Sequence, residues 1–110
     1  MSTLSSHVLD TSTGRPAQGL HVRLSAWDGA ILTQGVTDED GRIRGLEPED
    51  WEPGDYRLRF ATREWFAAQS VTGFYPEAVV SFTVAPGQQD EHFHVPLLLS
   101  PYGWSTYRGS

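Results

Sequence analysis

The most constraining feature of this sequence is that its apolar residues recur at every second position, in short segments that glycine, proline and aspartate interrupt. Tyr56, Leu58 and Phe60, for example, alternate with two arginines. Successive side chains of a β-strand point to opposite faces, so this spacing is typical of strands that bury one face. The Asp-Gly pair at 28–29, between two such segments, is a strong hairpin signal. The pattern therefore predicts an all-β domain.

We expect about seven strands and one short helix. The helix is expected at 62–69, where Thr62 can cap the first turn and the packing of Trp65 and Phe66 has to hold so short a segment. A chain of 110 residues is expected to form a single domain over 1–110. These elements predict a β-sandwich of two antiparallel sheets. The strands are expected at 5–11, 21–27, 31–37, 55–61 and 78–84, and in two further segments from 92 onward.

Composition excludes several classes of function. Fourteen acidic residues against eight basic ones give a net charge of −6, whereas nucleic-acid binding needs a basic patch. The absence of cysteine excludes disulfides and thiolate chemistry. No apolar stretch approaches the roughly 20 residues of a membrane span. Residues 1–6 lack the features of a signal peptide and the last residues are not a peroxisomal signal, so we expect a cytoplasmic protein with no membrane or nucleic-acid partner.

The last stretch of the chain, 92–110, carries the strongest functional signal. Alternation places His92 and His94 on one face of a strand, and Phe93 and Val95 on the other. After a Pro-Tyr-Gly turn, the alternation resumes in a segment rich in aromatic residues. Chain ends fray unless they are tied down. We therefore expect the tail to be a paired strand whose end lies at an interface or a site.

The tail resembles the carboxyl-terminal signature of the transthyretin-like 5-hydroxyisourate hydrolases. The matching residues are His-Val-Pro-Leu-Leu-Leu-Ser-Pro-Tyr at 94–102 and Ser-Thr-Tyr-Arg-Gly-Ser at 105–110. The Tyr-Arg-Gly-Ser ending separates those enzymes from the transthyretins, which share the Leu-Leu-Ser-Pro-Tyr part. Further matches are spread over nearly the whole chain, at 6–10, 14–17, 37 with 40–42, and 74–77.

The resemblance implies a transthyretin-like sandwich of two four-stranded sheets with one short helix. It also implies a homotetramer, a dimer of dimers, whose sites lie at the dimer–dimer interface and are lined by two subunits. Such enzymes hydrolyse 5-hydroxyisourate, formed by urate oxidation in purine catabolism, to 2-oxo-4-hydroxy-4-carboxy-5-ureidoimidazoline. They need no metal and no organic cofactor.

The resemblance also assigns the site residues. His7 and His94 would share the acid/base work, and the choice of base between the two stays open. Arg42 would donate to the substrate carbonyl, and the Asp-Gly-Arg context favours it over Arg44. His92 lies outside the matched motif and is expected to face solvent or to act through a neighbour. The expected catalytic set is His7, Arg42, His94 and Ser110, and the expected substrate-binding set adds Tyr107 and Arg108.

Three other interpretations stay open, and the weakest is a purely structural β-sandwich, such as a surface or adhesion module. A transthyretin-like protein could carry a small ligand in the same place without turnover, although the polar His, Arg and Tyr-Arg-Gly-Ser residues argue against an apolar channel. Alternatively, His7, His92 and His94 could hold a zinc ion in a metal-dependent hydrolase. The zinc hypothesis is the weaker of these two, because no evident fourth ligand and no cysteine accompany the three histidines.

Overall fold

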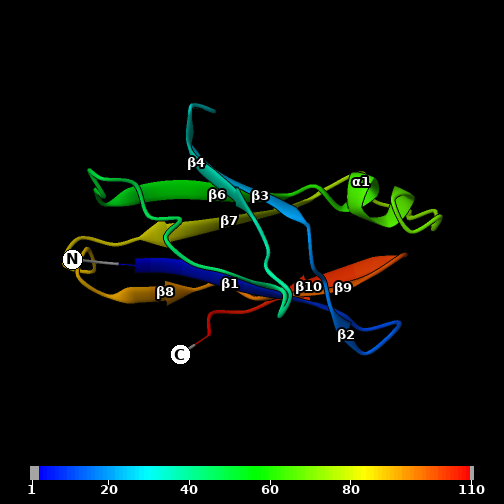
Figure 1. Cartoon of the computed structure of the whole chain (residues 1–110). Helices are drawn as coiled ribbons and strands as arrows, with labels where there is room; N and C mark the ends of the chain where they lie inside the picture. The colour runs from blue at the N-terminus through cyan, green and yellow to red at the C-terminus, as the bar shows by residue number, and fades with distance from the viewer. Residues whose placement is uncertain (1–2, 110) are drawn as a thin grey trace.

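Two β-sheets face each other across the core and one short helix lies at one end (Figure 1). A computed structural model of the chain describes residues 3–109. No helix in this part of the chain is long and apolar enough to cross a membrane. The elements are β1 (Thr3–Asp10), β2 (Arg15–Pro16), β3 (His21–Ala26), β4 (Ile31–Val36), β5 (Arg42–Ile43), β6 (Gly54–Phe60), α1 (Thr62–Ala67), β7 (Ala78–Val84), β8 (His92–His94), β9 (Leu97–Ser100) and β10 (Gly103–Thr106).

The first sheet has the order β4-β3-β6-β7 and is antiparallel throughout. Its strands follow the predicted alternation: Tyr56, Leu58 and Phe60 are buried, whereas the two arginines between them are partly exposed. The hairpin predicted at Asp28-Gly29 joins β3 to β4. The β-sandwich expected from the pattern is therefore confirmed.

The second sheet is built around β1, and each edge of β1 is paired in two pieces. Along one edge β1 pairs first with β8 and then with β9, both in parallel, and along the other with β5 and β2, both antiparallel. Strand β10 adds to the far side of β9. The sheet thus has six segments but four strand positions. Parallel pairing departs from the expected antiparallel arrangement, because β1 and β8 are joined through the whole first sheet and not by a hairpin.

The break between β8 and β9 falls at Pro96, which has no N–H to donate to a ladder. Polar groups of β1 pair with the backbone at this break. The N–H of Val95 donates to the Ser5 carbonyl at 3.0 Å, and the buried Ser6 hydroxyl donates to the Val95 carbonyl at 2.6 Å. The break therefore leaves no unpaired backbone group at Val95.

The predicted helix is confirmed as α1, but the expected cap is wrong. Ala61 is the N-cap residue, and no side chain caps the helix. Thr62 is already the first helical residue, and its hydroxyl donates to the Tyr75 carbonyl at 3.2 Å. Packing holds the helix as expected, because Phe66 is buried and the indole N–H of Trp65 donates to the Gln18 carbonyl at 2.7 Å.

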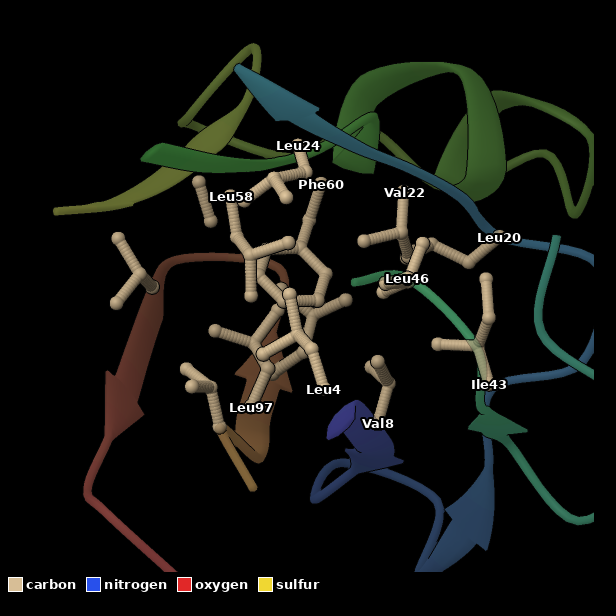
Figure 2. Packing of buried hydrophobic residues seen from close by; sticks show 14 of the residues in the cluster. Leu4, Val8, Leu20, Val22, Leu24, Ile43, Leu46, Leu58, Phe60 and Leu97 are labelled. Atoms are coloured by element: carbon tan, nitrogen blue, oxygen red, sulfur yellow. The ribbon is translucent and has the colours of Figure 1, made fainter. Parts of the chain in front are cut away.

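The core lies between the two sheets (Figure 2). Leu24, Leu58 and Phe60 of the first sheet point toward side chains of the second sheet. Each fully buried Leu, Val or Phe stabilises the fold by about 1.5–3 kcal/mol relative to an exposed one. The labelled partners from outside the first sheet include Leu4, Val8 and Leu97. This core leaves the opposite, outward face of β1 and β8 free for polar groups.

The turn before β5 depends on a glycine, and two variants test this. Gly41 has φ +73°, and a Cβ there would lie 2.5 Å from the Val8 carbonyl oxygen. Gly14 has φ +74° but would meet nothing within 4 Å. Gly14→Ala is expected to lower the free energy of unfolding by about 1–2 kcal/mol through the left-handed backbone alone. Gly41→Ala is expected to lower it by about 1–3 kcal/mol more, because of the clash. Urea unfolding of both variants measures the difference, and equal losses would contradict the close approach.

Candidate active site

The outward face of β1 and β8 gathers hydroxyl and imidazole groups. Thr3, Ser5 and His7 alternate along this face of β1. The parallel register places Thr3 opposite His92 and Ser5 opposite His94. Phe93, between the two histidines, is buried in the core as predicted. Strand alternation thus sorts β8 into a core face and a polar face.

Arg42 joins the same face through the other edge of β1. In the antiparallel register of β1 and β5, Arg42 is the direct partner of His7. Side chains of directly opposite residues lie on one face with their Cβ atoms about 5 Å apart. The structure therefore brings together two of the predicted site residues, His7 and Arg42.

A carboxylate fixes the turn that presents Arg42. Oδ1 of Asp38 accepts hydrogen bonds from the backbone N–H groups of Asp40 and Arg42, both at 2.9 Å. The Arg42 N–H is the main cause that lowers the pKa of Asp38 below 3.8, and Arg44 and Arg42 add favourable charge. The ionised form of Asp38 is therefore the form that holds the turn.

Among residues 3–109, His7 has one ring nitrogen engaged and one without a hydrogen-bond partner. Its Nε2 lies 2.9 Å from the backbone carbonyl of Asp40. A carbonyl oxygen only accepts hydrogen bonds, so Nε2 of His7 carries the proton and donates it. In the neutral ring, Nδ1 is then the basic nitrogen. The same turn that presents Arg42 therefore also fixes the tautomer of His7.

His94 is held at its inner nitrogen and is kept neutral. Its Nδ1 lies 2.8 Å from the Ser5 hydroxyl, and within residues 3–109 its Nε2 has no hydrogen-bond partner. Burial of the ring lowers the pKa of His94 below its ordinary value of 6.5, and the charges of His92, His7 and Arg42 lower it further. The Ser5 backbone partly opposes this shift. His94 therefore offers a neutral, basic Nε2 to the open face.

The tail reaches His94 as a continuation of β10. Gly103 pairs with Ser100 and Thr106 with Leu97, and a bridge between Gly109 and His94 continues the same register. The ladder is interrupted at residues 107 and 108, and the register places residue 107 opposite Pro96, which has no N–H to donate. The Gly109 N–H donates to the His94 carbonyl at 2.8 Å. The tail is therefore paired, as expected, and it ends beside His94. Figure 1 shows the red segment running toward β8.

The predicted tail residues do not all gather at the histidines. Arg108 is engaged elsewhere, because its guanidinium lies 2.9 Å from the Glu91 carboxylate and 4.8 Å from the centre of the Phe93 ring. Tyr107 is exposed to 59%. Ser110 lies outside the described residues. Among residues 3–109, the structure therefore groups His7, Arg42 and His94 and leaves the Arg108 guanidinium on its ion pair with Glu91.

Sequence reasoning missed Ser5 and the packing of Gly109. Ser5 is buried, and its hydroxyl lies within hydrogen-bond distance of both His94 and His92. Its alternation with His7 was the available signal. His92 is exposed, and the Ser5 hydroxyl links it to His94.

The zinc hypothesis requires a cluster of metal ligands, which residues 3–109 of a single chain do not form. In the part of the chain that the structure describes, no three His, Cys, Asp or Glu side chains are grouped so that they could hold a metal ion. His7 donates its Nε2 proton to a carbonyl, and His92 and His94 are bridged by a hydroxyl. These hydrogen bonds orient the three rings toward protein partners.

Comparison with known proteins identifies relatives over nearly the whole chain. A model of the HIUase/Transthyretin family matches residues 4–109. A 5-hydroxyisourate hydrolase of Salmonella typhimurium is 48% identical over 113 residues, which cover 97% of this chain and 80% of that protein. A 5-hydroxyisourate hydrolase of Mus musculus is 44% identical over 115 residues, which cover 99% of this chain and 96% of that protein.

Solved structures agree with the sequence relatives. The structure of Klebsiella pneumoniae 5-hydroxyisourate hydrolase superposes with a TM-score of 0.88 at 42% identity, covering 98% of this chain and 99% of that one. Sea bream transthyretin in complex with thyroxine superposes with a TM-score of 0.87 at 32% identity, covering 96% of this chain and 93% of that one. The sandwich is therefore similar both to a hydrolase and to a ligand-binding protein.

Proposed function

This chain belongs to the HIUase/transthyretin family, and from that premise we propose that it hydrolyses 5-hydroxyisourate to 2-oxo-4-hydroxy-4-carboxy-5-ureidoimidazoline. The observation that carries the proposal is the polar cluster of His7, Arg42 and His94 on one sheet face. Relatives at 44% and 48% identity bear the name of this hydrolase. A site that carries an apolar ligand would gain nothing from two imidazoles and a guanidinium.

The reaction opens a ring amide with water, and His94 is placed to start it. Nε2 of His94 takes a proton from the attacking water while the water oxygen bonds to the amide carbon. The C–N bond of the ring then breaks, the ring nitrogen takes up a proton, and the carbonyl carbon becomes a carboxyl group. Burial, which lowers the pKa of His94, supports its role as the base, because the neutral form is the one that accepts a proton.

Arg42 supplies a donor to the developing oxyanion, and His7 supplies a group that can orient the substrate. The guanidinium of Arg42 is always charged and planar, so it can donate to the oxygen that becomes negative when water adds. His7 is next to Arg42 across the strands. Its Nδ1, which has no hydrogen-bond partner among residues 3–109, can orient the substrate or exchange a proton with it. In this assignment, one group each from β1, β5 and β8 takes part in the hydrolysis on the outward face of the sheet.

The same proposal includes an assembly and a cellular location. The cluster lies on an open sheet face, and Tyr107 of the tail is exposed. A homotetramer, formed as a dimer of dimers, would cover this face and complete the pocket, with Tyr107, Arg108 and Ser110 closing it. We place the enzyme in the cytoplasm, as expected from the sequence.

One assay separates turnover from binding. Purified protein is mixed with freshly generated 5-hydroxyisourate, and the decay of its absorbance is followed against the uncatalysed decay, with and without exhaustive chelation. Acceleration that chelation leaves unchanged supports the proposal. Binding of a small aromatic ligand without any acceleration would favour the transthyretin-like carrier, and activity lost on chelation would restore the zinc reading.

The acid limb of the pH profile is a further expected result. Because burial lowers the pKa of His94 below 6.5, the ring stays neutral at pH values where an exposed histidine would be protonated. The activity measured as kcat/KM is therefore expected to fall only below pH 6.5 as the pH decreases. Measurement between about pH 5 and 8 gives the midpoint. An acid limb centred above 6.5 would contradict the assignment of His94 as the base.

A further inference from the structure

Four side chains form a continuous line of hydrogen bonds on the open face of β1 and β8. Thr3 Oγ1 bonds to Nδ1 of His92 at the exposed end. Nε2 of the same His92 ring lies 3.3 Å from the Ser5 hydroxyl. That hydroxyl also lies 2.8 Å from Nδ1 of His94. The line therefore begins at exposed groups and ends at the ring whose Nε2 faces the site.

The line has two consistent proton arrangements. The Ser5 hydroxyl holds one hydrogen, so it donates to one imidazole and accepts from the other. If Nε2 of His94 is bare, its Nδ1–H donates to Ser5, Ser5 donates to His92, and His92 donates to Thr3. If Nε2 of His94 carries the proton, every bond runs the other way. The two arrangements differ in whether His94 is ready to act as a base or as an acid.

We propose that Ser5 and His92 form a proton relay that switches His94 between its base and acid forms during turnover. The inference rests on the proposed hydrolysis. When Nε2 of His94 takes a proton from water, Nδ1 releases its proton to Ser5. Ser5 passes its own hydrogen to Nε2 of His92, and Nδ1 of His92 gives its proton to solvent by way of Thr3. His94 then holds its proton on Nε2 and delivers it to the ring nitrogen that leaves, and the line resets as solvent returns one proton.

The charges around His94 favour moving the proton outward. His7 on β1, Arg42 on β5 and His92 on β8 all disfavour a positive charge on the partly buried His94 ring. The nearby carboxylate of Glu91 is paired with Arg108 and does not offset them. His92 is exposed, so a transient positive charge is better hydrated there than on His94. The rings are nearly parallel, with 13° between their planes and 6.3 Å between their centres.

Kinetics of two single variants and their double variant test the relay. His92→Phe keeps a flat ring and Ser5→Ala keeps the small side chain, but each interrupts the line. Each is expected to lower kcat about 10- to 100-fold with little change in KM, and the double variant is expected to lose no more than either single one. Ser5→Thr, which keeps a hydroxyl, should restore most of kcat. Imidazole in the buffer should raise kcat of His92→Ala but not of the wild type.

Matched controls separate the relay from a structural role. His21→Phe removes an exposed histidine of the other sheet, and Ser6→Ala removes the neighbouring hydroxyl that faces the core. Both should keep the kcat of the wild type, even if Ser6→Ala unfolds more easily. Additive losses in the double variant, unchanged kcat in the single variants, or equal losses in the controls would overturn the relay.

A second measurement needs no substrate. Nitrogen-15 NMR of labelled histidine reports which ring nitrogen carries the proton. The line requires His92 and His94 to share the same tautomer balance, and Ser5→Ala should uncouple the two rings. Opposite tautomers in the wild type would overturn the relay. If the wild type fails to accelerate hydrolysis, the proposed function fails, while this measurement still decides whether the line exists.

Discussion

Replacing His94 by asparagine is expected to lower kcat about 10²- to 10⁴-fold, the usual contribution of a general acid or base. The side-chain amide of asparagine occupies the position of Nδ1, so it can keep the hydrogen bond to Ser5. It has no group at the position of Nε2 and does not titrate. The variant should therefore fold normally and bind substrate, yet fail to accept the proton from water. Decay of fresh 5-hydroxyisourate, measured above its spontaneous rate, gives the loss.

Variants of Arg42 and His7 are also expected to lose activity. Arg42→Ala removes the donor to the developing oxyanion and is expected to cost about 10²- to 10³-fold in kcat. His7→Asn should also lose activity, and the double variant with His94→Asn should lose less than the product of the two, because groups that act as a unit are not additive. His21→Asn, in the other sheet, is the control. Wild-type kcat in His94→Asn, with unchanged thermal unfolding, would remove the acid/base assignment.

Alternation was enough to predict much of this site. The two-residue period placed His92 and His94 opposite Phe93, and the structure keeps that division. The same period puts Ser5 on the face of His7, a signal that the prediction did not use. What alternation cannot supply is register between segments far apart in the chain. Ser5 and His94 are 89 positions apart, and only the parallel pairing of β1 with β8 makes them neighbours.

Two predictions were wrong for identifiable physical reasons. Thr62 has the side chain of a cap, but its hydroxyl finds the Tyr75 carbonyl, so the helix begins one residue earlier than a side-chain cap requires. The parallel pairing of β1 was not expected, because hairpin signals report only antiparallel neighbours. In both cases a tertiary contact outweighed the local preference. These errors do not affect which residues share the polar face, because that depends only on the alternation of side chains along each strand.

Gly109→Ala is expected to lower kcat about 10- to 100-fold, although alanine is a minimal change. A Cβ at this position would lie 2.5 Å from Cδ2 of His94 and 3.2 Å from its Cγ. Such a separation is far below van der Waals contact, so the imidazole must move and its hydrogen bond to Ser5 must lengthen or break. A displacement of about 1 Å in a catalytic group can reduce turnover about 10²-fold. The absence of a side chain at 109 is what allows the tail to lie against the ring.

The matched control for Gly109→Ala is Gly103→Ala in the same tail. A Cβ at 103 would meet its nearest atom, the Ser100 hydroxyl, at 3.7 Å, which is ordinary contact. This variant should keep wild-type kcat, and both variants should unfold within about 1 kcal/mol of the wild type in urea, because both positions lie outside the buried core. Because the N–H of residue 109 still donates to the His94 carbonyl, the tail stays paired in both. A selective loss of kcat in Gly109→Ala then assigns the effect to the position of the imidazole, whereas equal activity in the two variants would mean that the ring does not need its present place.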